Sequence, residues 1–344
     1  MRRAFGVDFE VPDGYLNTPS IGIPPVRAGQ AVEGAVRRWR TGVDQPADFD
    51  HAVATARQAF GRLVGVPADR VAIGSTVSQL VSCVAAGIPD GSRVLTAVGE
   101  FTSVTFPFAA QEHRGIKVIE ADLDQLPAAV DSADVVAVSV VQSADGSRVD
   151  LAALRRNARA AGVPVLLDAT QAAGWLPLEL DWADWVVAGG YKWLLSPRGA
   201  SWLAVHPRAM RLTRPISANW YAGADPWQSI YGLPLRLAQG ARALDLSPVW
   251  LAQVGAAVAL PLLASLDSGA VHAHCVGLAD RLRARLDLPP RGSAIVAVQA
   301  PDADRRLARA GIVASARAGK ARVGFHLYNT EADVDAVLNA LADR

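Results

Sequence analysis

Residues 186–195 read Val-Val-Ala-Gly-Gly-Tyr-Lys-Trp-Leu-Leu, an apolar run that contains a single charged residue, Lys192. Only three of the 34 basic residues in the chain are lysines, and the rest are arginines. Burying a lysine costs free energy, because the loss of water disfavours its ammonium form. An imine requires an amine that can lose its proton, which arginine cannot supply. We therefore predict that Lys192 forms a Schiff base; the alternative is a lysine that extends to the surface from a strand end.

The composition indicates a folded chain of two domains. With 344 residues, of which 51% are hydrophobic and 19% charged, the chain can bury a large core. The net charge of +1, without a basic block, gives no support to binding of nucleic acid or of a membrane. The N-terminus lacks the apolar core of a signal peptide, and the most apolar stretch, residues 254–263, is too short to cross a bilayer. We expect a cytoplasmic protein.

The cysteines and histidines do not form a metal-binding pattern. Cys83 and Cys275 lie far apart in the sequence, and a reducing compartment is the default for so few cysteines. His272 and His274 lack acidic neighbours, and a solvated helix face explains the pair better than a metal site does. We therefore expect no metal.

Strand-like and helix-like runs alternate between residues 46 and 206. Residues 135–140 and 163–167 are almost continuously apolar, as is typical of strands that are covered on both faces. Such strands form a mostly parallel sheet with helices on each side, and ligands bind at the carboxyl ends of the strands. The expected helices are 47–64, 76–87, 103–113 and 151–161, and the expected strands are 71–73, 93–97, 117–120, 135–140, 163–168, 185–188 and 201–205.

The regular alternation stops after residue 206. Residues 207–245 are irregular and rich in aromatic side chains, a composition that suits an interface. Beyond them we expect a smaller α+β domain, whose last helix begins at a capping box in residues 330–333. Its other expected elements are a helix ending near 265, a helix ending near 286, a helix over 302–310, and strands over 294–298, 312–316 and 322–326.

Asp168 ends a buried strand with a carboxylate. Pyridoxal phosphate (PLP) needs an acid against its pyridine nitrogen, because the protonated ring draws electrons from a substrate carbanion. Asp168 suits that role; the alternative is an aspartate that caps a helix or a turn. Gln171 can hydrogen-bond the ring hydroxyl or satisfy backbone groups. Phe101 follows the carboxyl end of another strand and can stack on the ring, or it belongs to the core.

A phosphate-binding turn is expected in residues 73–79, where a short strand leads into an amphipathic helix. Gly74 permits close approach of the backbone, and Ser75 and Thr76 place hydroxyl groups beside the free amides of a helix N-terminus. Any Ser or Thr at a helix N-cap has these features. Tyr191, next to the lysine, can add a phenol donor to the same phosphate.

Two stretches resemble a known family. Asp168-x-x-Gln171, followed by Gly-Tyr-Lys-Trp-Leu-Leu at residues 190–195, resembles the fold-type-I PLP enzymes of the class V aminotransferase group. That group includes cysteine desulfurases, kynureninases and isopenicillin N epimerase-like proteins. Residues 322–330 are similar to the C-terminal Arg-x-x-x-x-x-Tyr-Asn-Thr signature of the group. Further similarities lie in residues 15–19, 73–76 and 100–103.

The resemblance implies an α/β fold of PLP fold type I. The large domain would hold a mostly parallel seven-stranded sheet between helices, and a smaller C-terminal α+β domain would follow. We expect residues 1–45 to form an N-terminal segment that contributes to the active site, residues 46–240 the large PLP-binding domain, and residues 241–344 the small domain. A homodimer with shared active sites is also implied.

The resemblance further implies roles for single residues. Lys192 would hold PLP as an internal aldimine and later remove the Cα proton, which gives a quinonoid. Arg322 would bind the substrate α-carboxylate, for which a bidentate guanidinium is well suited, or it lies on a solvent-facing strand. The other implied roles are pairing of the pyridine nitrogen by Asp168, contact with the ring hydroxyl by Gln171 and Gln142, phosphate binding by Ser75, Thr76 and Tyr191, stacking by Phe101, substrate binding by Asn17, and a reach into the site of a partner subunit by Trp220.

The chain also departs from the group. Cysteine desulfurases carry a nucleophilic cysteine shortly before the C-terminal arginine, whereas residues 310–319 contain none. Cys275 lies too far upstream and Cys83 lies in an early helix, so we reject persulfide-forming desulfurase activity. The usual stacking histidine is absent, Asn17 replaces the customary aspartate, and Val104 stands where kynureninases have an aspartate.

We therefore predict a PLP-dependent enzyme that acts on an amino acid or an amine-bearing metabolite. Transamination ranks first, Cβ elimination by a lyase second and epimerisation third; the three use the same residues and differ in which bond is held perpendicular to the ring. A nucleotide-binding α/β protein would leave Lys192 unexplained, and the chain lacks the glycine patterns of phosphate loops that follow a strand. The joint presence of Lys192, Asp168 and Arg322 argues against a non-catalytic protein of PLP fold.

Overall fold

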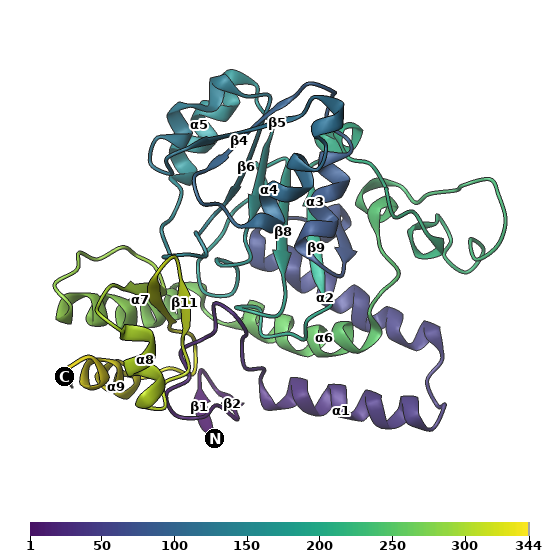
Figure 1. Cartoon of the computed structure of the whole chain (residues 1–344). Coiled ribbons are helices and arrows are strands. Elements are labelled where there is room, and N and C mark those ends of the chain that lie inside the picture. Colours follow the sequence, from purple (N-terminus) through teal and green to yellow (C-terminus); the bar gives the residue numbers. More distant parts are fainter. Residues whose placement is uncertain (343–344) are drawn as a thin grey trace.

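The computed structural model describes residues 1–342 of the chain and is organised around one large sheet (Figure 1). Its seven strands lie in the order β3-β9-β8-β7-β6-β4-β5. β9 runs antiparallel to both of its neighbours, while the other strands share one direction. The mostly parallel seven-stranded sheet is therefore confirmed. The strands are β3 (Val71–Gly74), β4 (Arg93–Ala97), β5 (Lys117–Ala121), β6 (Val135–Ser139), β7 (Val165–Asp168), β8 (Trp185–Gly189) and β9 (Ser201–Val205).

Helices cover both faces of this sheet, because its central strands send alternate side chains into two separate cores. In β6, Val136 and Val138 pack in the core that includes α2 and α5 side chains, whereas Val135 and Ala137 pack in the core that includes α3 and α4 side chains. Each buried aliphatic side chain stabilises the fold by roughly 1.5–3 kcal/mol relative to exposure. The helices are α2 (Asp50–Val64), α3 (Val77–Ala85), α4 (Thr102–Ala109) and α5 (Leu151–Ala161).

Helix α5 has the predicted bounds, because local signals define both of its ends. The Asp150 side chain accepts a hydrogen bond from the Ala153 amide at the N-terminus, and Gly162 takes a left-handed conformation with φ of 68° just after the C-terminus. Other helices begin or end a few residues away from the prediction, with short 3₁₀ turns at Pro46–Phe49 and Glu112–Arg114.

The N-terminal segment contains elements that the sequence pattern did not predict. A short hairpin joins β1 (Arg2–Ala4) to β2 (Val7–Phe9), and α1 (Val26–Arg40) packs against α6 (Trp250–Ser265). α6 in turn packs against α2 and supplies side chains to the core of the large sheet. Residues 26–40 and 250–265 thus form a layer under the large sheet (Figure 1).

A three-stranded antiparallel sheet in the order β10-β12-β11 forms the C-terminal domain with a core of its own. Strand β11 is shorter than the predicted 312–316, because Val313 pairs instead with Tyr15 of the N-terminal segment. In the part of the chain that the structure describes, no single helix is long and apolar enough to cross a membrane. Helices α6 and α7 reach the necessary length and hydropathy only when they are taken together, and a bend of 93° separates them. The elements are α7 (Ser268–Arg285), β10 (Ile295–Val298), α8 (Ala303–Arg309), β11 (Ser315–Arg317), β12 (Lys320–Gly324) and α9 (Glu331–Ala342).

The N-terminal segment is built into this C-terminal domain. The Leu16 amide donates to the Val313 carbonyl at 2.9 Å, and the Gly324 amide donates to the Leu16 carbonyl at 2.8 Å. Thr18 and Tyr328 share a hydrogen bond of 2.6 Å between their hydroxyl groups. The two ends of the chain are therefore paired with each other through backbone and side chains.

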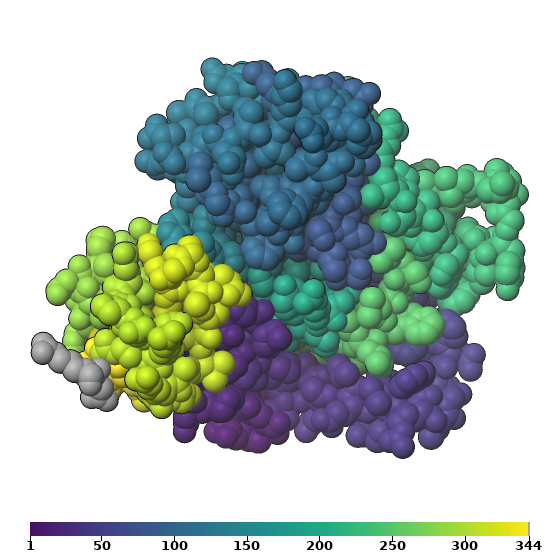
Figure 2. Space-filling view, in the orientation of Figure 1, coloured from purple at the N-terminus to yellow at the C-terminus, as the bar shows by residue number. Residues whose placement is uncertain are grey.

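Residues 213–246 form an irregular segment whose outer part extends from the body of the protein on one side (Figures 1 and 2), while Tyr221, Ala241 and Leu244 are buried in the cores of the large sheet. A backbone bridge between Gly223 and Leu237 closes its outer part. Several large apolar side chains in it are exposed: Ile216, Trp227, Ile230, Tyr231, Leu233 and Leu235.

Candidate active site

Lys192 lies just beyond the carboxyl end of β8, at the edge of the sheet where ligands bind in such folds. Its side chain is 6% exposed, and its amine faces a pocket and has no hydrogen-bond partner within residues 1–342. Burial lowers its pKa to about 8; the charge of Asp168 opposes this shift, whereas Arg322, Arg317 and Arg198 add to it. A fraction of the amine is therefore uncharged near neutral pH.

Gly190 makes the turn that carries the lysine. A Cβ atom at this position would lie 2.2 Å from Ser196 Oγ and 3.0 Å from the Trp202 ring. Only glycine fits without displacing these neighbours. The close packing explains why a glycine stands directly before Tyr191.

Asp168 lies at the carboxyl end of β7, beside the end of β8, and lines the same pocket as Lys192. It is almost fully buried and accepts a hydrogen bond of 2.8 Å from the Thr170 amide. Burial raises its pKa to about 6 and the negative charge of Glu100 adds to the rise, while Thr170 and Lys192 lower it. A buried carboxylate of this kind is poised to pair with a cationic ring nitrogen.

The predicted phosphate turn lies at the mouth of this pocket. Ser75 and Thr76 both line it, ahead of the first turn of α3, and so does Tyr191. The Thr76 hydroxyl accepts from the Gln79 amide at 3.3 Å, and Ser75 donates to the Gln79 side chain from both its amide and its hydroxyl. The turn is thus fixed in a conformation with a helix N-terminus directed at the pocket.

Phe101 is 40% exposed, and its ring centroid lies 5.0 Å from the Lys192 amine. It lies at the pocket and does not belong to the buried core clusters. This position is compatible with the predicted stacking on the cofactor ring.

Glu100 is a buried residue of the site for which the sequence predicts no role. Its carboxylate is buried and accepts four hydrogen bonds, from the Phe101 amide (2.7 Å), the Ser139 amide (2.7 Å), Ser139 Oγ (2.6 Å) and Gln142 Nε2 (2.8 Å). Gln142 thus contacts Glu100 and is not among the residues that line the pocket. The sequence signal was an acid placed between a strand end and an aromatic residue.

Gln171 lines the pocket, but its amide already has protein partners. Nε2 donates to the Pro19 carbonyl at 2.9 Å and to Ser143 Oγ at 3.1 Å, and Oε1 accepts from Trp193 Nε1 at 2.7 Å. These bonds connect the loop after β7 to the N-terminal segment. Contact between Gln171 and a ring hydroxyl stays a prediction.

Arg322 is a buried cation rather than an arginine on a solvent-facing strand, because its side chain is 1% exposed. It donates to the Ser143 carbonyl, to Ser143 Oγ at 3.0 Å, to Ser20 Oγ at 2.8 Å and to Ser315 Oγ at 3.2 Å. Among the residues that the structure describes, no carboxylate forms an ion pair with it. Burial lowers its pKa to about 10, and the nearby charge of Arg317 adds to this effect. Ser143 also lines the pocket, so Arg322 lies one residue behind its wall.

Like Gln142 and Arg322, the predicted site residues Asn17 and Trp220 lie outside the lining of the pocket. Asn17 belongs to the N-terminal segment, and its buried Oδ1 has no hydrogen-bond partner in the described chain. Trp220 lies in the projecting segment, where its ring contacts those of Tyr221 and Trp227 at centroid distances of 5.3 and 5.1 Å. Their predicted roles remain predictions. Pocket residues that sequence reasoning missed are Val77, Ser78, Ser103, Ser139, Ser143, Thr170 and Arg198.

The pocket fits PLP on the chemistry of its own groups. It offers a buried amine without a partner, a buried carboxylate, and a helix N-terminus with two hydroxyl groups. These groups match the aldehyde, the pyridine nitrogen and the phosphate of the cofactor.

A comparison with protein families agrees with this chemistry. The family model for aminotransferase class-V matches residues 30–309. The chain belongs to the aminotransferase class-V family. Family membership and the chemistry of the pocket confirm the predicted fold type and identify PLP as the cofactor of this class V protein.

Individual relatives span several reactions. The chain is 27% identical to an isopenicillin N epimerase from Streptomyces clavuligerus, with 95% of this chain and 93% of the relative covered. It is 24% identical to a kynureninase from Deinococcus radiodurans, with 79% and 71% covered. Among solved structures, the cystine C–S lyase C-DES in complex with cysteine persulfide has a TM-score of 0.86 at 20% identity, with 97% of this chain and 98% of the other covered. An apo cysteine desulfurase from Thermococcus onnurineus NA1 has a TM-score of 0.82 at 18% identity, with 94% and 92% covered. This class V chain therefore has the family fold, and its relatives do not agree on one reaction.

Proposed function

We propose that this protein is a PLP-dependent enzyme of aminotransferase type that acts on an α-amino acid. The observation that carries the proposal is the buried Lys192 amine, which faces the pocket without a hydrogen-bond partner in residues 1–342. PLP supplies an electron sink for the carbanion that forms when a substrate loses its Cα proton.

Lys192 would have two tasks, to hold the cofactor and to move the Cα proton. A pKa of about 8 leaves part of its amine uncharged near neutral pH, as a base requires. Asp168 would keep a proton on the pyridine nitrogen, and its burial strengthens that charge pair because little water screens it. Phe101 would restrict the ring to one plane by stacking.

Arg322 would bind the substrate α-carboxylate. Its guanidinium is held in place by serine oxygens and is not neutralised by a protein carboxylate within the described chain. A buried arginine without a counter-ion gains charge-assisted hydrogen bonds when a carboxylate binds. Because Ser143 separates it from the pocket, we expect the Ser143 side chain to share or yield this contact.

Cβ elimination is the second candidate, because the fold matches a cystine C–S lyase over almost the whole chain. Epimerisation ranks third and is supported by the epimerase relative. Persulfide-forming desulfurase activity is disfavoured, because Cys83 and Cys275 are buried in α3 and α7, and burial raises the pKa of both thiols.

We also propose that the protein is a cytoplasmic homodimer that buries the apolar side chains of its projecting segment. Exposed apolar patches mark interaction sites, and Tyr231, Leu233 and Leu235 are strongly exposed in this chain. Analytical ultracentrifugation of the native protein and of Leu233→Asp/Leu235→Asp tests this: a dimer that the double variant weakens supports the proposal, and a native monomer refutes it.

One experiment tests the proposed function directly. The purified protein is loaded with PLP, reduced with borohydride and digested, and mass spectrometry locates the added cofactor mass. We expect it on Lys192, with Lys192→Ala unlabelled and inactive. Incubation with a panel of amino acids then scores keto-acid-dependent amino transfer, release of pyruvate or sulfide, and deuterium exchange at Cα. Label on Lys117 or Lys320 instead would refute the proposal, and elimination without amino transfer would favour the lyase.

A further inference from the structure

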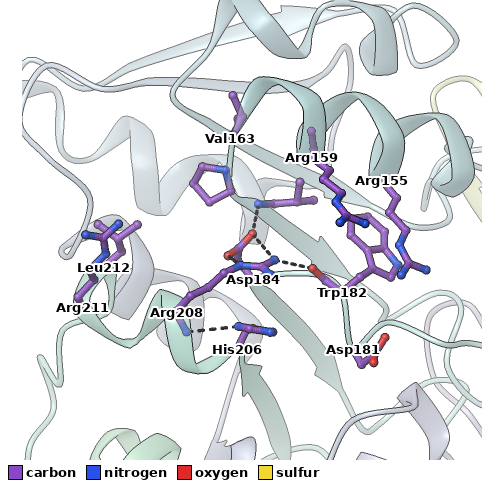
Figure 3. Close-up of a pocket in the computed structure, with 14 residues that line it drawn as sticks. Arg155, Arg159, Val163, Asp181, Trp182, Asp184, His206, Arg208, Arg211 and Leu212 are labelled. Carbon is purple, nitrogen blue, oxygen red and sulfur yellow. Dashed lines mark hydrogen bonds and ion pairs between the residues drawn. The ribbon is translucent and has the colours of Figure 1, made fainter.

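A second cavity lies at the edge of the sheet opposite the active site. It has a volume of about 580 Å³ and adjoins the amino ends of β7 and β8 (Figure 3). At the opposite ends of these strands, Asp168 is the last residue of β7 and Lys192 follows β8. The end of α5, the loops before β7 and β8, and the 3₁₀ helix Pro207–Leu212 form its walls. Because the strands separate the two cavities, a ligand here would not share the PLP phosphate site.

Four arginines line this cavity. Arg155 and Arg159 extend from successive turns of α5, and Arg208 and Arg211 come from the 3₁₀ helix (Figure 3). Asp181 and Asp184 are the acidic residues of the lining, so the four guanidinium groups outnumber the two carboxylates. The unequal numbers leave an excess of positive charge in a concave site, which attracts anions.

One ion pair fixes part of the wall. Asp184 is 6% exposed and accepts from Arg208 Nε at 2.7 Å and from the Val165 amide at 2.9 Å. Arg208 also donates to the Trp182 carbonyl at 2.6 Å, which holds the loop before β8. The negative charge of Asp184 is therefore already matched by Arg208.

The other three arginines have no carboxylate partner. Within residues 1–342, neither Arg155 nor Arg159 nor Arg211 forms an ion pair or a hydrogen bond. The Arg155 guanidinium lies 5.9 Å above the Trp182 ring, which makes a flat apolar wall beside the charge. Unpaired guanidinium groups match carboxylate and phosphate oxygens in a bidentate manner.

His206 also lines the cavity. Its pKa is lowered, first by burial and then by the charges of Arg208 and Arg70, against the opposing charges of Asp184 and Asp181. A volume of about 580 Å³ is also within the range of sites that hold small ligands, roughly 300–1,000 Å³.

We propose that this cavity binds a small organic anion with at least two carboxylate or phosphate groups, whose apolar part contacts Trp182. Arg155 and Arg159 would hold one anionic group and Arg211 the other. A compact ligand fits better than a protein segment, because the charges line a concave pocket rather than a broad surface.

The test uses the PLP-loaded protein, so that the cofactor occupies its own phosphate site. Inorganic pyrophosphate and citrate are titrated calorimetrically at constant ionic strength, and PLP absorbance is followed to detect any release of cofactor. We expect one saturable site per chain for at least one of the two probes. Arg155→Ala/Arg159→Ala should weaken binding about tenfold or more, because it removes charge-assisted hydrogen bonds.

Arg285→Ala/Arg309→Ala is the matched control, because both arginines are exposed on the C-terminal domain and the loss of charge is the same. Its affinity should equal that of the native protein. An Arg211→Ala variant, with circular dichroism to establish folding, gives an independent measurement of the same site. Absence of saturable binding in the native protein would overturn the proposal, and so would equal weakening by the control pair.

Discussion

Replacing Asp168 with asparagine is expected to stabilise the apoenzyme while it removes most activity of the holoenzyme. Burial raises the pKa of Asp168 from its ordinary 3.8 to about 6. One pKa unit corresponds to about 1.4 kcal/mol, so keeping this carboxylate ionised in the folded protein costs about 3 kcal/mol. Asparagine has nearly the same shape and retains an oxygen for the Thr170 amide, but it carries no charge to desolvate.

The predicted gain in stability of the Asp168→Asn apoenzyme depends on pH in a defined direction. Below about pH 3 the carboxyl group is almost fully protonated in both the folded and the unfolded chain, and the stability difference due to its ionisation should vanish. As the pH rises from 3.8 to about 6, the unfolded native chain ionises first, and the folded native protein loses stability. The difference should therefore grow over this window and reach about 3 kcal/mol above it.

Urea unfolding of the cofactor-free proteins at several pH values measures this difference. Asp131→Asn is a suitable control, because Asp131 is exposed, and its stability should follow that of the native protein. Equal stability of the native and Asp168→Asn apoenzymes at pH 7 would refute the reasoning, and so would a difference of the same size below about pH 3. Unchanged turnover of Asp168→Asn would separately remove its role at the ring nitrogen.

Three further substitutions test other parts of the site. Arg322→Ala should raise KM for α-amino acids by roughly 10- to 100-fold, because it removes a charged hydrogen-bond donor, and should leave amines without the carboxylate unaffected; steady-state kinetics on a matched pair of substrates checks this. Glu100→Gln should lower the free energy of unfolding, measured in urea, by roughly 1–3 kcal/mol, because an amide cannot accept from all four donors that surround the carboxylate. An unchanged free energy of unfolding would contradict this explanation. Gly190→Ala should lower PLP affinity and should lower the free energy of unfolding by roughly 1–3 kcal/mol, because the new Cβ would meet Ser196. Gly29→Ala is the control: Gly29 lies in α1 with open space around it, so its replacement should not lower the free energy of unfolding.

Much of the large sheet could be predicted from the sequence, because its strands are continuous apolar runs bounded by clear turns. β4 and β9 have the predicted bounds. Helix α1 could not be predicted in the same way, because it is rich in arginine and buries only Ala28 and Ala35. Its contact with α6 pairs segments that lie more than 200 residues apart, and no local pattern reports such a contact.

The same distinction between local patterns and long-range contacts applies to the candidate site. Lys192, Asp168 and the Ser75–Thr76 turn follow directly from strand ends and a helix N-terminus, and the structure brings them to one pocket. The surroundings of Arg322 depend on Ser20 and Ser143, which are distant in the chain, so the sequence could not place them. Gln142 was assigned to the ring hydroxyl, whereas its amide donates to Glu100, a buried acid whose partners only the fold reveals.

Pairing the first residues of the chain with the last ones has a consequence during synthesis. Thr18 bonds to Tyr328, 310 positions later, and Leu16 bonds to Val313 and Gly324. A ribosome that adds about 5–20 residues per second needs roughly 15–60 s to cover this interval. During that time the large sheet has already emerged, while Leu16 and Thr18 wait without their C-terminal partners. Arg322 therefore acquires its partners late, and premature release of the nascent chain would leave the large sheet without this buried arginine.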